Sequence, residues 1–156
     1  MGLLVVGLGN ILLKDEGVGV HVVNSLRDRP MPEDVRLMDG ATMGVDLLND
    51  ILESDRVIIV DSAQMDVSAG EYRTFGISEI EDGVRFPNYS LHDLTLAETI
   101  ALGGIIATLP PIRIIGIQPE SIEQGDELTS TLRKNFNEYV DHVHDTIRSF
   151  VKEEAY

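Results

Sequence analysis

The chain has 156 residues, a length typical of one folded domain, and 43% hydrophobic and 25% charged residues, which are globular values. Its 27 acidic against 12 basic residues give a formal charge of −15, which repels phosphate backbones and argues against a nucleic-acid partner. Cysteine is absent, which excludes disulfides, thiolate zinc sites and a cysteine nucleophile. No secretory signal or membrane span is expected. We therefore expect one cytoplasmic domain over residues 1–156.

In the first part of the chain, short apolar runs bounded by turn residues alternate with amphipathic stretches, which is typical of α/β folds. The runs Leu3–Val6 and Val35–Met38 predict strands, and the stretches 17–29 and 45–52 predict helices. The clearest strand is Arg56–Val60 (RVIIV), because a continuous β-branched run suits the centre of a parallel sheet.

The second part predicts a less buried strand at 71–75, irregular structure at 76–89, a strand at 112–117 and a long C-terminal helix at 128–151. Between the irregular segment and the strand, Ser90 opens a helix with Asp93 in a capping-box-like position, and Gly103 with Gly104 ends or loosens it. Its expected buried face is formed by Leu94, Ala97, Ile100 and Ala101.

This order of elements predicts a three-layer α/β fold. Its sheet is mostly parallel, twisted and five-stranded, with helices on both faces joined through right-handed crossovers. The strand at 71–75 is expected to run antiparallel at one edge.

Four candidate site residues fall where predicted strands end or helices begin. Glu16 precedes the first helix, and Asp39 and Asp61 directly follow the second and third strands. His92 lies in the first turn of the helix opened by Ser90. Because ligands bind beyond the carboxyl ends of parallel strands, we expect all four to face one edge of the sheet. Carboxylates with an imidazole suit a divalent ion such as nickel or zinc.

Each of these residues also has a structural explanation. Asp39 could close a turn and Glu16 could complement a helix dipole. Asp61, which leaves a hydrophobic strand, is harder to explain in this way. The convergence of the four therefore favours a site more than any one of them does. His142 and His144, two residues apart on the last helix, point in different directions and are expected to be surface residues.

Rival motifs fail. The pair Gly7 and Gly9 after the first strand invites a dinucleotide interpretation, but the third glycine position holds Leu12. Asp15 and Glu16 would also repel a pyrophosphate at the helix N-terminus. The chain has no P-loop, HExxH or GxSxG motif.

The run at residues 7–19, GLGNILLKDEGVG, resembles the N-terminal signature of hydrogenase maturation proteases, GxGNxLxxD(D/E)GxG. Further matches follow in order: DGATMG at 39–44, VDSA at 60–63, SLH at 90–92 and GIQP at 116–119. The similarity covers nearly the whole chain, and its spacing is more specific than any single motif.

The resemblance implies an aspartyl-type endopeptidase that removes a C-terminal extension from the large subunit of a nickel–iron hydrogenase after nickel insertion. The family's metal-contacting positions correspond to Glu16, Asp61 and His92, and Asp39 corresponds to a further acidic position linked to activity or substrate recognition. The nickel belongs to the large-subunit precursor, which is the expected partner, so no permanent cofactor is expected. The base that activates the attacking water is then Asp39 or Asp61.

Two alternatives remain open from the sequence. One is a non-catalytic nickel chaperone or docking module for hydrogenase assembly that uses the same acidic residues. The other is a protease of the same fold with an unrelated substrate. The chain also departs from the family's DGGTxG motif, because Ala41 replaces its middle glycine. Alanine adopts positive φ only at a cost, so the loop there is expected to differ slightly.

Overall fold

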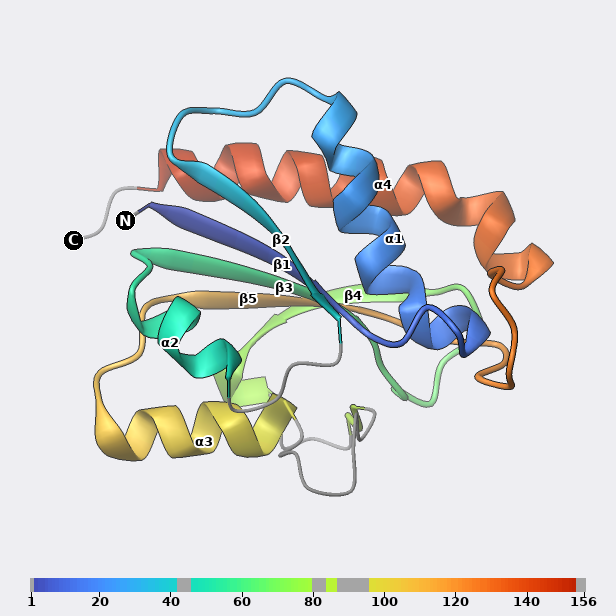
Figure 1. Ribbon diagram of the computed structural model, residues 1–156, viewed down its shortest axis with the longest axis horizontal. Helices are drawn as coiled ribbons and strands as arrows, with labels where there is room; N and C mark the ends of the chain where they lie inside the picture. Colours follow the sequence, from blue (N-terminus) through green and yellow to red (C-terminus); the bar gives the residue numbers. More distant parts are fainter. Residues whose placement is uncertain (1, 42–45, 80–83, 87–95, 154–156) are drawn as a thin grey trace.

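The computed structural model describes residues 2–41, 46–79, 84–86 and 96–153. Five strands form one sheet in the order β2-β1-β3-β5-β4 (Figure 1). The first four of these pair in parallel, and β4 pairs antiparallel with β5 at the edge. The predicted sheet is therefore confirmed, including its antiparallel edge strand. The strands are β1 (Leu3–Leu8), β2 (Val35–Ala41), β3 (Arg56–Ser62), β4 (Tyr72–Gly76) and β5 (Ile112–Ile117).

Helices cover both faces of the sheet, α1 and α4 one face and α2 and α3 the other (Figure 1). Among the described helices, none is long and apolar enough to cross a membrane. The α-helices are α1 (Val18–Ser25), α2 (Leu47–Leu52), α3 (Leu96–Ile106) and α4 (Ser130–Lys152), and the short 3₁₀ helices are η1 (Lys14–Gly17), η2 (Leu26–Asp28) and η3 (Ile77–Glu79).

The core consists of two apolar layers, one on each side of the central strands. In β3, Ile58 and Val60 pack towards α1 and α4, and Val57 and Ile59 pack towards α2 and α3. Successive side chains of a strand point to opposite faces. A central strand covered on both sides therefore needs an unbroken apolar run, and this is why β3 is the clearest strand in the sequence.

Two predicted helices differ from the observed ones. The stretch predicted as one helix over 17–29 is divided into α1 and η2, and η1 precedes it. The helix α3 continues through Gly103 and Gly104 to Ile106 instead of ending there. Gly103 packs closely, because a Cβ atom at this position would lie 2.7 Å from a methyl carbon of Leu48 in α2. The predicted helix start at Ser90 lies outside the described residues.

Candidate active site at the carboxyl edge of the sheet

The glycines of the N-terminal motif bring η1 and α1 onto the ends of the strands. A Cβ atom on Gly19 would lie 2.1 Å from the carbonyl oxygen of Val60 in β3. Gly9 has a φ of +129°, and a Cβ atom there would lie 1.9 Å from the carbonyl oxygen of Glu16. Both positions therefore require glycine. The motif serves close packing between backbone segments, which agrees with the rejection of a dinucleotide fingerprint.

Glu16 is held at this edge in a buried position. Glu16 is only 5% exposed. It lies on η1, which contacts β3. Burial raises the pKa of the Glu16 carboxyl, and a hydrogen bond from the backbone N–H of Asn10 partly offsets that rise. No described lysine or arginine forms an ion pair with Glu16. A carboxylate in such a place is well suited to bind a cation.

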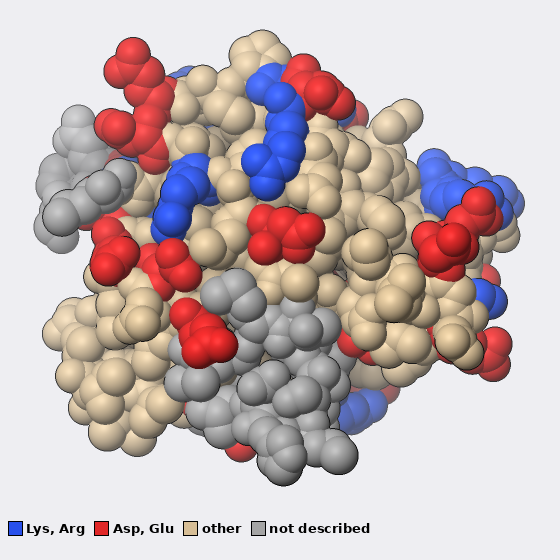
Figure 2. Space-filling model, in the orientation of Figure 1, with Lys and Arg blue, Asp and Glu red and all other residues tan. Residues whose placement is uncertain are grey.

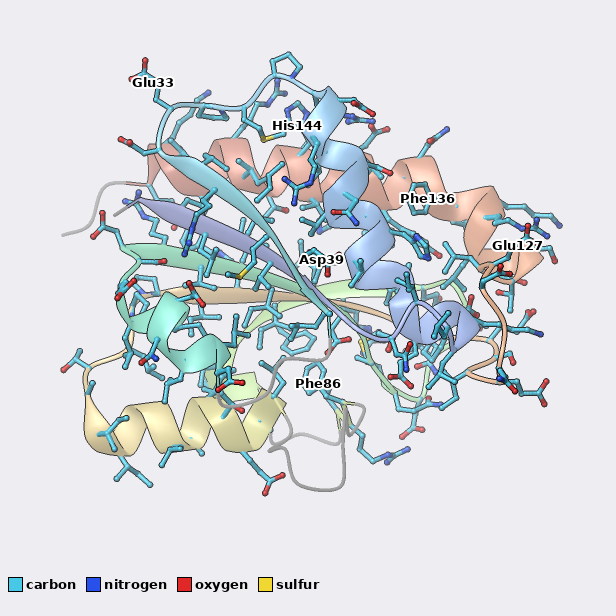
Figure 3. All side chains as sticks on the ribbon, viewed as in Figure 1. Glu33, Asp39, Phe86, Glu127, Phe136 and His144 are labelled. Carbon is cyan, nitrogen blue, oxygen red and sulfur yellow. The ribbon has the colours of Figure 1, made fainter. Side chains whose placement is uncertain are left out.

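Asp61 and Asp39 lie at the same edge but on opposite faces of the sheet. Asp39 pairs with Gly7, and Gly7 pairs with Val60, whose side chain packs in the α1–α4 layer. Asp39 therefore projects on the α1 side, as its position in Figure 3 also shows. Asp61 follows Val60, so it projects towards the α2–α3 side, and it is fully buried. Strand order alone did not reveal this separation.

Asp39 has a local structural role. It is exposed, and its Oδ1 accepts a hydrogen bond of 2.9 Å from the backbone N–H of Ala41. Ala41 has a φ of +44°, so this alanine does adopt the left-handed conformation that a glycine would take at less cost. Burial lowers the pKa of His21, and the negative charge of Asp39 partly offsets this effect.

The third predicted metal ligand, His92, lies outside the described residues. In the part of the chain that the structure describes, no group of three His, Asp or Glu side chains could hold a metal ion. The assignment of Glu16, Asp61 and His92 as metal contacts therefore stays a prediction, as does a catalytic role for Asp39 or Asp61.

Sequence reasoning missed Asp15, which is fully buried beside Glu16. Its carboxylate accepts four hydrogen bonds: from the backbone N–H groups of Glu120 and Ser121, and from the backbone N–H and the hydroxyl of Thr129, at 2.8–3.1 Å. These bonds fasten the segment between β5 and α4 to η1. The acidic pair at positions 15 and 16 was visible in the sequence, but partners more than 100 residues away were not.

Gln118 was also given no role from the sequence, although it is buried at the end of β5. Its Oε1 accepts a hydrogen bond of 2.8 Å from the backbone N–H of Met65, and its Nε2 donates to Gln64. The side chain therefore joins the ends of β3 and β5.

The two histidines of α4 point in different directions, as predicted. Neither is simply a surface residue, however, because both are partly buried. The Nε2 atom of His142 lies 2.6 Å from the hydroxyl of Thr74 in β4, and that of His144 lies 3.1 Å from the carbonyl oxygen of Pro30.

These features define an open α/β protein with buried carboxylates at the carboxyl ends of its parallel strands. A family model described as hydrogenase maturation protease matches residues 20–146. The match begins four residues after Glu16 and includes Asp39 and Asp61. The chain is 34% identical over 134 residues to the hydrogenase 2 maturation protease of Escherichia coli, an alignment that covers 85% of this chain and 82% of the relative. The chain belongs to the hydrogenase maturation protease family.

Other comparisons agree with this placement. The hydrogenase expression/formation protein HoxM of Azotobacter vinelandii is 32% identical over 134 residues, covering 84% of this chain and 65% of HoxM. The chain thus spans slightly less than two thirds of that relative's length. The solved structure of the hydrogenase maturating endopeptidase HybD from E. coli superposes with a TM-score of 0.81 at 29% identity, covering 96% of this chain and 94% of HybD. That likeness confirms the fold.

Proposed function

We propose that this protein is an endopeptidase that removes the C-terminal extension from a nickel-loaded hydrogenase large-subunit precursor. Membership of the maturation protease family supports peptidase activity, and the names of the relatives support hydrogenase as the target. The strongly negative charge favours a cation-bearing partner over nucleic acid. We expect the protein to act in the cytoplasm.

The observation that carries the proposal is the burial of two carboxylates at one edge of the sheet. Glu16 lies on η1, which contacts β3, and Asp61 lies near the end of β3. Burying a charged carboxylate is costly unless it is paired or coordinates a metal, and Glu16 forms no ion pair with a described lysine or arginine. In the proposed complex, Glu16, Asp61 and His92 contact the nickel that the precursor displays. A precursor without nickel lacks this anchor, so cleavage reports on metal loading.

The attack on the peptide bond requires a water molecule and a base. Nickel near the scissile bond can polarise the carbonyl group or lower the pKa of the attacking water. Asp39 or Asp61 accepts the proton. Because these two carboxylates project from opposite faces of the sheet, separate substitutions distinguish their roles. Asp61→Asn should abolish both nickel-dependent binding of the precursor and cleavage, whereas Asp39→Asn should lower kcat while binding remains if Asp39 is the base.

The test is intact-mass analysis of the nickel-loaded and nickel-free precursor after incubation with the wild-type protein, Glu16→Gln and Glu33→Gln. Glu33 is an exposed glutamate far from Asp39 (Figure 3), so Glu33→Gln is the matched control. We expect the wild type and the control to shorten only the loaded precursor. Glu16→Gln, with folding checked by circular dichroism, should act at least about 100-fold more slowly, the loss expected for a key electrostatic contact.

Normal processing by Glu16→Gln would rule out recognition through this carboxylate. If the folded wild type shortened neither form but bound nickel tightly, the non-catalytic nickel module would replace the protease proposal.

A further inference from the structure

A small pocket lies directly beyond the strand that carries Asp61. It has a volume of about 170 Å³, and its walls are residues 62–64 at the end of β3, residues 85–86, and residues 119–122 after β5. This is well below the roughly 300–1,000 Å³ of pockets that hold a drug-sized molecule. Its size therefore suits a single side chain of a polypeptide.

The wall of the pocket is mainly apolar. Its two charged residues have partners of their own: Arg85 lies 3.7 Å from Asp66, and Glu120 accepts a hydrogen bond of 2.6 Å from the hydroxyl of Thr131. The remaining surface includes four apolar side chains, which favour an uncharged aliphatic occupant. They are Ala63, Phe86 (labelled in Figure 3), Pro119 and Ile122.

Ser62 adds a polar group to this wall. The residue is 1% exposed, and its Oγ has no hydrogen-bond partner among the described residues. A buried hydroxyl without a partner destabilises a folded protein, so its presence calls for an explanation. Ser62 directly follows Asp61 and lines the pocket. A polypeptide laid along this edge would offer backbone carbonyl groups to its hydroxyl.

Hydrogen bonds hold both walls of the pocket in place. Gln64 and Arg85 exchange two backbone hydrogen bonds, of 2.9 and 3.0 Å. The opposite wall is fastened by the Asp15 carboxylate, which accepts hydrogen bonds from the N–H groups of Glu120 and Ser121. A preformed pocket loses little conformational freedom when it is filled, which favours binding.

We propose that this pocket binds one aliphatic side chain of the substrate polypeptide next to the bond that is cut. In the same complex, the Ser62 hydroxyl donates a hydrogen bond to the substrate backbone. The inference rests on the proposed endopeptidase function and adds to it a subsite that selects the residue beside the scissile bond.

The experiment uses nickel-loaded precursors in which each residue flanking the cut is changed in turn to Gly, Val, Leu or Asp. The proteins are the wild type, Ile122→Ala and Ile122→Trp. Ile122 is half exposed in a loop, so these changes leave the core intact. Matched controls are Ile105→Ala and Ile105→Trp, because Ile105 is exposed on α3 away from the pocket.

For the wild type, we expect kcat/KM with Val or Leu at one flanking position to exceed that with Asp by roughly 10- to 100-fold. Ile122→Trp should lower this preference at least about tenfold, and Ile122→Ala should shift it towards Leu. The Ile105 variants should match the wild type. An unchanged order of preference in both Ile122 variants would overturn the side-chain subsite.

Ser62→Ala tests the hydrogen bond separately. We expect kcat/KM to fall about tenfold for every precursor, Gly included, while the midpoint of thermal unfolding stays the same or rises. An unchanged kcat/KM, or a loss that follows a lower unfolding midpoint, would overturn the role of Ser62. Failure of the wild type to shorten any precursor would instead overturn the proposed function, and the subsite with it.

Discussion

The two faces of the sheet are covered by helices of different character. The 23-residue helix α4 is strongly amphipathic, and together with α1 it covers one face of the sheet. Its buried side chains recur along one side, and its other side carries the charges that solvent requires. The buried residues are Leu132, Tyr139, Val140, Val143, Ile147 and Phe150.

The helix α3 on the other face is largely apolar, and Glu98 in its first turn is its one charged residue. Ile105 and Ile106, at its C-terminal end, are 81% and 61% exposed. No charged residue occurs from position 99 to 112, and Figure 2 shows this end of the molecule as uncharged surface. Asp61 projects towards this same face. The comparison indicates that α1 and α4 mainly hold the fold together, whereas the α2–α3 face combines a buried carboxylate with apolar surface open to contact.

The largest effect that tests this comparison is on stability. Ile147→Ala in α4 removes a fully buried side chain and should lower the free energy of unfolding by about 2–5 kcal/mol. Ile105→Ala removes the same atoms from the exposed end of α3 and should change it by less than about 0.5 kcal/mol. Chemical denaturation of both variants measures the difference. Similar losses would mean that α3 is as important for the fold as α4.

A substitution of Asp15 provides the second test, because its carboxylate joins η1 to the segment between β5 and α4. Asp15→Ala leaves four donors at Glu120, Ser121 and Thr129 without their acceptor. We expect a loss on the order of 3 kcal/mol in unfolding free energy. Asp126→Ala is the control, since Asp126 is an exposed carboxylate of the same segment. Equal stability of the two variants would show that solvent can satisfy these donors in place of Asp15.

The sequence was sufficient to predict the sheet largely because the central strands β1 and β3 contain continuous apolar runs. It was also sufficient for α4, whose apolar residues recur at helical spacing. It was only partly sufficient for α3, where Ile100 is buried as expected but Ala101 is exposed. A helix with few polar residues gives a weak periodic signal, so its buried face is decided by its packing against α2 and the sheet.

The site was predictable only in part, for a similar reason. Local patterns placed Glu16, Asp39 and Asp61 near strand ends. However, β2 and β3 are longer than predicted, so Asp39 and Asp61 lie within these strands and not after them. The opposite orientation of Asp39 and Asp61 depends on the pairing of β2 with β1 and of β1 with β3. The role of Asp15 depends on contacts with residues more than 100 positions away. Neither kind of information is present in a local motif.

The smallest expected effect on stability concerns a hydrogen bond between α4 and the segment before β4. The hydroxyl of the buried Tyr139 donates a hydrogen bond of 2.7 Å to the carbonyl oxygen of Gly70. Burial raises the pKa of Tyr139 to about 12, from an ordinary value of about 10. The folded state thus favours the neutral phenol. This contribution to stability is complete below about pH 10 and is lost as the pH rises towards 12.

Tyr139→Phe should therefore lower the unfolding free energy by about 1 kcal/mol at pH 7. Above pH 10, the wild type should lose stability more steeply than the variant, so the difference between them should shrink. Urea denaturation of both proteins from pH 8 to 11 measures this, and titration of the other lysine and tyrosine side chains affects both alike. A constant difference across that range would show that the Tyr139 hydroxyl ionises in the folded protein as readily as in the unfolded chain.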